Sequence, residues 1–483
     1  KQENREELEV KIAQIQTQIS IYQELEEKKK RIIERKKFLK EEKERLQTVI
    51  NHATVLTMDP EKHIYKDGYV VMEDNKILET GEGKGPENAD CVVDGKGGIL
   101  MPGMVNVHSH ISMIPFRSMG DDCPDRLRRF LFPLELEAMT PELIYLSARY
   151  AICELLLSGV TSVLDMYYFE DQVARACEKM GIRAWVGETV INMATCDSKE
   201  PYGGLAICEE LLKKWSGHDR IHPMAAPHAT NTNSPEMLKA AYDLACRYEA
   251  PYTLHVSEMD YEMELFREKY QKTPIEFLAD LGVLGPRTIA AHCIHATEHD
   301  IALFAETGTK VAHCVGANTK GGKGVCPVLD MRNQGVCVGV GTDGPSSGNT
   351  LDLFTQFKMI ASAQKTKYHS RGVFPAVDIV EMGTMGGARV LGAEKEIGSI
   401  EPGKKADLVL LETESVNMFP IYNVYSAIVY SANASNVDSV WVDGKRLVKN
   451  HRLLCADLTA ERKKLSEAMG EFVSRAEKYP DVL

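Results

Sequence analysis

Apolar and polar positions in the middle of the chain predict short strands that alternate with helices. Eight apolar runs read as strands, namely Val105–His108, Thr161–Asp165, Ala184–Gly187, His222–Ala226, Tyr252–His255, Thr288–His292, Lys310–Cys314 and Cys337–Gly341. Longer helical segments lie between them, such as Pro141–Ser158, Pro235–Tyr248 and Glu298–Glu306. Eight strand–helix units predict an α/β fold, a (β/α)8 TIM-like barrel with its active site at the carboxyl ends of the strands.

Strand-rich segments flank this barrel on both sides. The predicted strands are Val49–Met58, Gly68–Met72 and Cys91–Asp94 before it, and Ala406–Leu411, Ala427–Tyr430 and Val437–Lys445 after it. Asp-Pro, Asp-Asn-Lys and Gly-rich turns separate the first three. We therefore expect a small β-sandwich domain built from residues 47–103 and 396–455, a barrel over residues 104–395 and a C-terminal helix over residues 456–483.

Residues 1–46 have a different character, because they are highly charged and contain neither Gly nor Pro. Apolar residues follow a coiled-coil spacing, at Leu8, Ile12, Ile15, Ile19 and Tyr22 and then at Leu25, Ile32, Leu39 and Leu46. The segment predicts a coiled-coil helix, which we interpret as an added or fused oligomerisation element. A single solvated helix is the alternative, since charged residues dilute the apolar seam.

The amino-acid composition argues against several classes of protein. A net charge of −13 argues against a nucleic-acid binder, which would carry a basic face. The twelve cysteines are scattered and include no Cys-x-x-Cys pair, which is typical of reduced thiols in a cytoplasmic protein. The N-terminus lacks the apolar core of a signal peptide, and no apolar stretch is long enough to span a membrane.

Histidines and carboxylates lie at the ends of the predicted strands. These residues are His108 and His110 on the first strand, His228 after the fourth, His255 and Glu258 at the fifth, His292 at the sixth and Asp343 after the eighth. Any one histidine is explained equally well as a structural residue, but chance placement of the set is improbable. Three imidazoles and one carboxylate would hold a divalent cation with a position open for water, whose pKa the cation lowers. Asp343 could accept the water's proton, Glu258 could pass a proton to the substrate, and His292 could stabilise developing charge.

Residues 47–455 resemble the amidohydrolase superfamily, in its aminohydrolase branch of nucleoside, guanine and cytosine deaminases and triazine hydrolases. The matching stretches are Pro102–His110, Ala226–Ala229, Leu254–Glu258, Ala291–His295, Gly341–Gly344, Gly386–Gly392 and Ile397–Val409. By this resemblance the metal ligands are His108, His110, His255 and Asp343. The resemblance also implies that Glu258 and His292 are the catalytic pair and that His228 lines the substrate site.

Details of the sequence separate branches of this superfamily. The fourth strand carries no lysine that could bridge two metals, so we expect one metal, zinc first and iron as the alternative. Glu258 favours deamination over hydrolytic dechlorination. The segment Gly316–Lys323 has the wrong spacing for a phosphate-binding loop and is predicted to be a flexible loop.

Substrate contacts depart from the resemblance at two positions. Glu188 stands where S-adenosylhomocysteine deaminases carry an arginine, and it could accept hydrogen bonds from an amino edge or simply pair with a nearby arginine. Asn318 remains from the family's motif after the seventh strand, although the neighbouring proline does not. We interpret Glu188 and Asn318 as candidate substrate contacts. The arginines between residues 120 and 135 are interpreted as a charged helix face rather than as an anion site.

These features together predict a mononuclear metal-dependent aminohydrolase that deaminates an amino-substituted purine, pterin or nucleoside and releases ammonia. Hydrolysis of a chloride, alkylamine or amide group at the same site is the alternative, and a non-catalytic scaffold is a more distant one. The expected partners are a small heterocyclic substrate and further copies of the chain, with neither nucleic acid nor membrane.

Overall fold

The computed structural model describes residues 16, 19, 25–30 and 46–479. The chain divides into two compact units, Lys1–Gln47 and Thr48–Leu483. The coiled coil predicted for residues 1–46 lies outside the described residues, apart from residues 16, 19 and 25–30, which are helical. Among the described residues, no helix combines the length and the apolar character that a membrane span requires.

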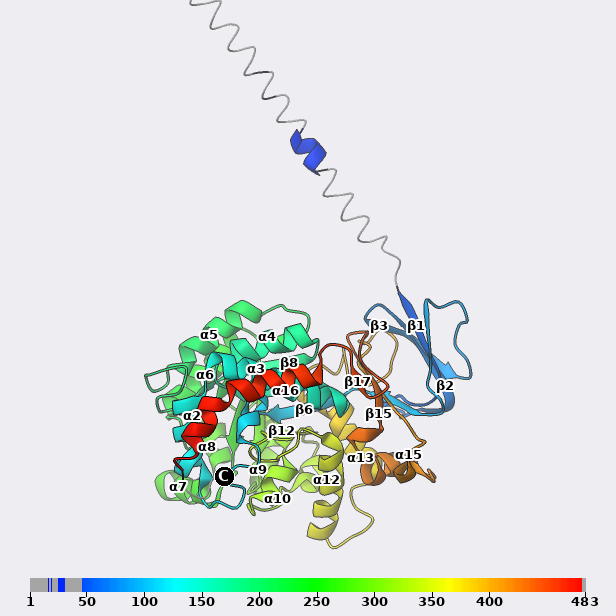
Figure 1. The fold of residues 1–483 in the computed structure, drawn as a ribbon. Coiled ribbons are helices and arrows are strands. Elements are labelled where there is room, and N and C mark those ends of the chain that lie inside the picture. Colours follow the sequence, from blue (N-terminus) through cyan, green and yellow to red (C-terminus); the bar gives the residue numbers. More distant parts are fainter. Residues whose placement is uncertain (1–15, 17–18, 20–24, 31–45, 480–483) are drawn as a thin grey trace, which may run out of the picture. The chain divides into compact units, whose positions relative to one another are not determined.

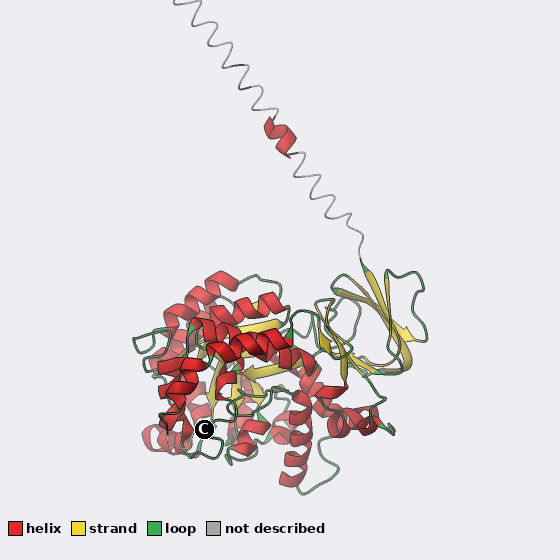
Figure 2. Ribbon diagram, in the orientation of Figure 1, coloured by secondary structure: helices red, strands yellow, loops and turns green. Residues whose placement is uncertain are grey.

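Eight parallel strands form a nearly closed barrel surrounded by helices, as Figures 1 and 2 show. The strands are β6 (Met104–Ser109), β7 (Val160–Tyr167), β8 (Arg183–Val190), β9 (Ile221–Pro227), β10 (Tyr252–Val256), β11 (Thr288–His292), β12 (Lys310–His313) and β13 (Val338–Val340). Each strand pairs with its neighbours in sequence order. Every residue of β7, β8 and β10 is buried, as expected for strands covered on both faces. The predicted barrel is confirmed.

Side chains close the barrel where β13 meets β6. The backbone N–H of Asp343 donates to the His108 carbonyl at 3.0 Å. The Asn106 amide donates to the Thr342 hydroxyl at 2.7 Å and accepts from the Thr342 N–H at 3.2 Å. The residues that seal the barrel are thus two predicted metal ligands and residues close to them in the chain.

Helices connect the strands and follow the last one. They are α2 (Phe132–Ala138), α3 (Pro141–Leu157), α4 (Glu170–Met180), α5 (Gly204–Trp215), α6 (Pro235–Arg247), α7 (Asp260–Tyr270), α8 (Pro274–Leu281), α9 (Glu298–Thr307), α10 (Val315–Lys320), α11 (Val328–Asn333), α12 (Leu353–Lys367), α13 (Ala376–Glu381) and α14 (Gly387–Leu391). Three of them begin with a Ser/Thr-Pro pair, in which the hydroxyl of Thr140, Ser234 or Thr273 caps the first turn. This local chemistry explains why their starts are readable from sequence.

The two flanks combine in one mixed sheet of nine strands. Its strands are β1 (Gln47–Leu56), β2 (Ile64–Glu73), β3 (Lys76–Glu82), β4 (Cys91–Asp94), β5 (Ile99–Pro102), β14 (Leu408–Leu411), β15 (Val437–Val442), β16 (Lys445–Lys449) and β17 (Arg452–Leu453). β5 from the first flank pairs antiparallel with β14 from the second. A separate sheet built from both ends of the chain is therefore present.

Two local predictions after residue 396 need correction. The apolar run Ala427–Tyr430, predicted as a strand, belongs to a π-helical turn over Ala427–Ser431 that follows α15 (Val424–Ser426). The Asn423 side chain accepts from the Ser426 N–H and starts this helical segment, which the apolar pattern alone does not reveal. The C-terminal helix is divided into α16 (Leu458–Ala468) and α17 (Gly470–Ala476).

A buried ion pair ties the barrel to the nine-stranded sheet. Arg183, the first residue of β8, donates to both carboxylate oxygens of Asp407, at 2.9 and 3.2 Å. Both side chains are almost fully buried, at 1% and 2% exposed. Asp407 also accepts from the Asp443 N–H at 2.6 Å, so its carboxylate is well satisfied.

Replacing Asp407 by Ala would leave the Arg183 charge buried without its main partner. We expect the free energy of unfolding to fall by about 3–5 kcal/mol, measured by guanidinium denaturation. Asp243→Ala is the matched control, because Asp243 pairs with Lys239 on the exposed face of α6, where the loss should be below about 1 kcal/mol. Equal effects of the two substitutions would contradict a stabilising role for the buried pair.

Candidate metal centre and active site

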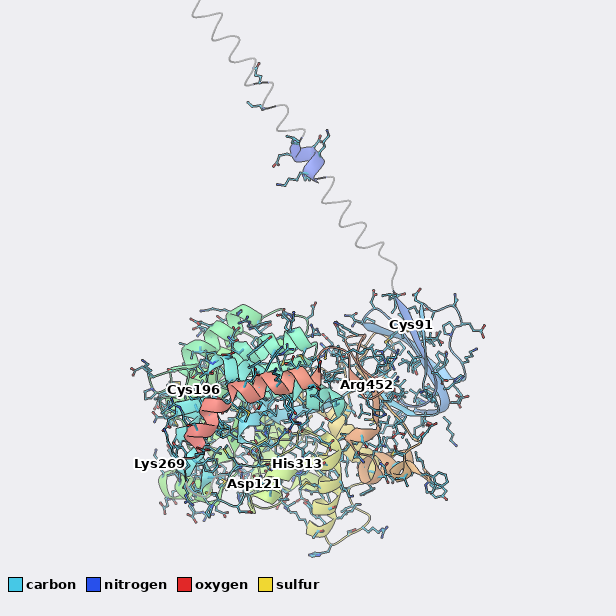
Figure 3. The ribbon with its side chains drawn as sticks, in the orientation of Figure 1. Cys91, Asp121, Cys196, Lys269, His313 and Arg452 are labelled. Carbon is cyan, nitrogen blue, oxygen red and sulfur yellow. The ribbon has the colours of Figure 1, made fainter. Side chains whose placement is uncertain are left out.

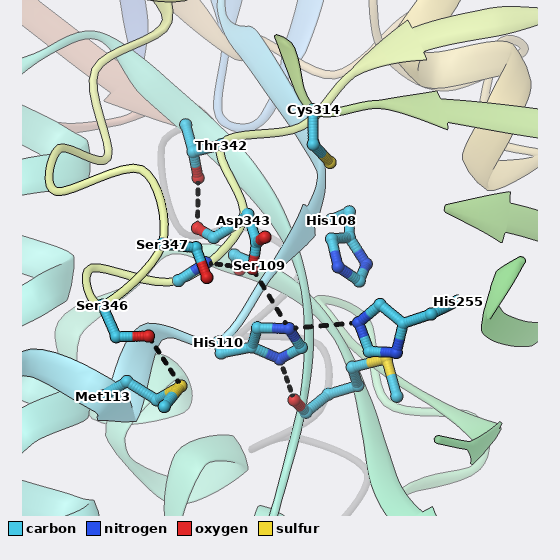
Figure 4. Close-up of polar contacts among 12 residues, drawn as sticks. His108, Ser109, His110, Met113, His255, Cys314, Thr342, Asp343, Ser346 and Ser347 are labelled. Atoms are coloured by element: carbon cyan, nitrogen blue, oxygen red, sulfur yellow. Dashed lines mark hydrogen bonds and ion pairs between the residues drawn. The ribbon is translucent and has the colours of Figure 1, made fainter. Parts of the chain in front are cut away.

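The carboxyl ends of β6 and β10 and the loop after β13 bring three imidazoles and one carboxylate together (Figure 4). His110 Nε2 lies 3.3 Å from Asp343 Oδ1 and 3.4 Å from His255 Nε2. The ring centre of His108 is 4.9 Å from those of His110 and His255. Ligand atoms of His108, His110 and Asp343 all lie within 4.8 Å of one another. The four predicted ligands thus face one small volume.

His108 and His255 in this cluster are uncharged, which allows them to bind a cation. Burial, followed by the neighbouring imidazoles, lowers the pKa of His108 and His255 well below the ordinary value, so both rings are neutral. Both ring nitrogens of His108 are buried and have no hydrogen-bond partner among the described residues. A divalent cation would satisfy one of them, and three nitrogens with one carboxylate oxygen match the donor set of such an ion.

Backbone carbonyls orient two of the imidazoles. Nδ1 of His110 lies 2.5 Å from the Met166 carbonyl, and Nδ1 of His255 lies 2.5 Å from the His228 carbonyl. A carbonyl only accepts, so each Nδ1 carries the proton and donates it. Each Nε2 is therefore left with a free lone pair that points into the cluster.

Left-handed backbone conformations turn the side chains of His292 and Asp343 into the site. His292 has φ of 71° and Asp343 has φ of 61°, values that non-glycine residues seldom adopt. Nε2 of His292 lies 3.8 Å from Glu258 Oε1 and 4.0 Å from Asp343 Oδ2. On the other side of the ring, Nδ1 donates to Asn318 Oδ1 at 2.8 Å. Asn318 therefore holds the His292 ring with Nε2 toward the carboxylates.

Glu258 is ionised in this arrangement. Burial raises the pKa of its carboxyl group, but His292 and then Lys323 lower it more, so the pKa lies below the usual range. Lys323 forms an ion pair with Glu258. Lys323 is a functional residue that the sequence does not reveal, because the segment Gly316–Lys323 is predicted to be a flexible loop. This prediction is wrong, since the first part of the segment belongs to α10.

A cavity of about 450 Å³ opens above the cluster. His228 lines it, as the sequence predicted, and the Phe132 ring meets the His228 ring edge-on at 5.9 Å. Asp121, labelled in Figure 3, lines the same cavity and ion-pairs with Lys320 at 2.6 Å. The volume and the mixture of aromatic and polar walls suit a small heterocyclic ligand.

Glu188 and Asn318, the other two predicted substrate contacts, lie outside this cavity lining. Glu188 is fully buried and accepts from the Glu170 N–H at 2.9 Å. Strand alternation explains the correction, because the residue of β8 that faces the cavity is Thr189 and Glu188 points to the other side of the strand. Asn318 lies behind His292, where it orients the ring instead of meeting the substrate.

Comparison with known proteins gives consistent matches over most of the chain. Residues 99–447 match the family model described as Amidohydrolase family. A 5-methylthioadenosine/S-adenosylhomocysteine deaminase from Syntrophus aciditrophicus is 36% identical over 416 residues, which cover 85% of this chain and 94% of that protein. A 5′-deoxyadenosine deaminase from Methanothermobacter thermautotrophicus is 38% identical over 390 residues, or 80% and 90% of the two chains. The crystal structure of an adenosine deaminase from Xanthomonas campestris with bound zinc has a TM-score of 0.85, 29% identity and coverage of 89% and 99%.

Glu135 on the cavity wall carries a buried carboxyl group whose protonation makes the stability of the fold depend on pH. Burial raises the pKa of Glu135 to about 8, although the Tyr167 hydroxyl, which donates to it at 2.7 Å, lowers it in part. The folded protein therefore keeps this proton while the unfolded chain has lost it, so folding is disfavoured as pH rises toward 8.

Glu135→Gln removes this titration and keeps the shape of the side chain. We expect the stability of the variant relative to the wild type to increase between about pH 5 and about pH 9, by up to a few kcal/mol. The measurement is chemical denaturation across this range, with Glu137→Gln at an exposed position of α2 as the control. A stability difference that stays constant with pH would show that Glu135 ionises normally.

Proposed function

The chain belongs to the amidohydrolase family, and from this membership we propose that it is a mononuclear metal-dependent aminohydrolase that deaminates the adenine ring of a nucleoside. The observation that carries the proposal is the cluster of His108, His110, His255 and Asp343 beside Glu258 and His292 at the base of one cavity. The names of the similar proteins, which are adenosine-type deaminases, support the nucleoside.

In this proposal the four ligands hold one divalent cation, with zinc preferred and iron as the alternative. The family uses a divalent metal, and one similar structure contains zinc. The cation supplies an activated water near neutral pH. A single ion is proposed because β9 carries no lysine that could bridge two metals.

The reaction replaces the ring amine by the oxygen of water. Asp343 accepts one proton of the attacking water as the oxygen adds to the ring carbon that bears the amine. Glu258, ionised at rest, takes up the other proton of the water and passes it to the adjacent ring nitrogen. His292, held by Asn318, stabilises the oxygen of the tetrahedral adduct, and the C–N bond then breaks as Asp343 returns its proton to the amine, which leaves as ammonia.

The rim of the cavity favours a nucleoside without a carboxylate. Within the described residues, the lysine and arginine side chains that line the cavity already form hydrogen bonds or ion pairs with other groups of the protein. Arg126 donates to the Ser346 carbonyl and, at 2.8 Å, to the Ser347 hydroxyl, while Lys320 and Lys323 form ion pairs. Ion pairs neutralise both lysines, and Arg126 is held by two neutral acceptors, so we propose an adenine nucleoside with an uncharged 5′ group.

Elemental analysis tests the metal centre. Purified protein should contain about one zinc or iron per chain, and His255→Ala should lose it, because two nitrogens and one oxygen hold a cation less tightly. His451→Ala, which removes an exposed histidine, is the control and should keep the metal. Two metals per chain, or unchanged metal content in His255→Ala, would contradict the proposed ligand set.

Ammonia release tests the reaction. Glu258→Gln should lower kcat for 5′-deoxyadenosine about 10²- to 10⁴-fold, because the amide cannot carry the proton to the ring nitrogen. Glu264→Gln at an exposed position of α7 should leave kcat unchanged. S-adenosylhomocysteine, which carries a carboxylate, should show a lower kcat/KM than 5′-deoxyadenosine. A metal-loaded wild type that releases no ammonia from adenine nucleosides would contradict the proposed function.

A further inference from the structure

The amino end of the barrel contains a second cavity, with a volume of about 600 Å³. The starts of β8, β9, β11 and β12 form one side of it, and residues 390–397, which follow from α14, form another. The apolar interior of the barrel, which includes Met224, Ile289 and Ala312, lies between this cavity and the metal centre. The second cavity is therefore separate from the proposed active site.

Nitrogen-bearing side chains face the inside of the barrel at the starts of four strands. Each of these residues lies two positions before a residue of the interior cluster, in the pairs Arg183 and Trp185, His222 and Met224, Arg287 and Ile289, and Lys310 and Ala312. Residues two apart on a strand share a face, and all four residues line the cavity. Branched apolar side chains normally fill the interior of such a barrel, so three cationic side chains and a histidine at one end need a separate reason.

Two of these side chains have no hydrogen-bond or ion-pair partner among the residues that the structure describes. Arg183 is held by Asp407, and burial lowers the pKa of His222 to about 4, so His222 is a neutral ring that stacks on Trp185 at 4.5 Å. Arg287 and Lys310, in contrast, make no side-chain hydrogen bond or ion pair within the described residues. Ile289 pairs with Lys310 in the β11–β12 ladder, so Lys310 and Arg287, which lies two residues before Ile289, stand at the starts of adjacent strands.

Lys310 lies in surroundings where a positive charge without an ion-pair partner is unfavourable. The side chain is partly buried, and burial lowers the pKa of its ammonium group. Glu394 attracts the ammonium group electrostatically, and Glu249 and Glu396 line the cavity at exposed positions, but none of these three carboxylates forms an ion pair with Lys310 within the described residues. A bound anion would neutralise the two unpaired cations in a partly desolvated place, where charge-assisted hydrogen bonds are strong.

We propose that this cavity binds a small phosphate-bearing anion through Arg287 and Lys310. The planar guanidinium offers two parallel donors to phosphate oxygens, and the ammonium adds a point charge from the neighbouring strand. The stacked His222 and Trp185 rings form an apolar wall beside the charged groups. The cavity volume lies within the range of small-molecule sites.

Isothermal titration calorimetry with inorganic phosphate tests the proposal on the full-length, metal-loaded protein. The wild type should bind phosphate saturably at one site. Arg287→Gln and Lys310→Gln should each raise the Kd about tenfold or more, because each removes a charge-assisted hydrogen bond. Lys358→Gln, which removes an exposed positive charge on α12, should leave the Kd unchanged.

Lys310→Arg is the companion variant, because it keeps the charge and should bind phosphate within a few-fold of the wild type. Circular dichroism and metal content establish that each variant is folded. The proposal is overturned if the wild type shows no saturable phosphate binding, or if the glutamine variants bind as well as Lys358→Gln. It is also overturned if a folded Lys310→Arg loses as much affinity as Lys310→Gln. None of these outcomes depends on deaminase activity.

Discussion

Closure of the barrel at the β6–β13 seam is the constraint on which the metal centre depends. The backbone N–H of Asp343 donates to the carbonyl of His108, so one hydrogen bond joins two of the proposed ligands through their own main chains. Asn106, two residues before His108, and Thr342, one residue before Asp343, form hydrogen bonds with each other across the same seam. The first and last strands of the barrel come from distant parts of the sequence, and the ligand geometry exists only after they meet. Fold and site therefore form as one cooperative unit.

The site concentrates features that are unfavourable elsewhere in a protein. It holds desolvated imidazoles with lowered pKa values, two ionised carboxylates and left-handed conformations at His292 and Asp343. The surrounding barrel, with its fully buried strands, supplies the stability that such an arrangement requires. The same logic applies at the amino end, where Arg183 is satisfied by Asp407 while Arg287 and Lys310 form no ion pair within the part of the chain that the structure describes.

Local pattern was enough to predict the eight barrel strands and the residues at their ends, because strand periodicity and Ser/Thr-Pro helix starts depend on neighbours in sequence. It failed where a tertiary choice decided the outcome. Glu188 was misassigned because the inward face of β8 depends on how that strand is set in the barrel, and that setting places Thr189 in the cavity. Asn318 and Lys323 reach the site from α10 and the turn after it, and Glu135 reaches it from α2. No spacing rule indicates how such segments fold over the strand ends.

The hydrogen bonds that orient His110 and His255 end on main-chain carbonyls, those of Met166 and His228. A carbonyl group is present whatever side chain the residue carries. Both residues also line the substrate cavity, so their side chains can be exchanged during evolution or in a directed-evolution library while the ligands keep their orientation. Substrate range and metal binding can therefore change independently, although they depend on the same short stretches of chain. The scaffold can acquire new substrates while its metal ligands stay in place.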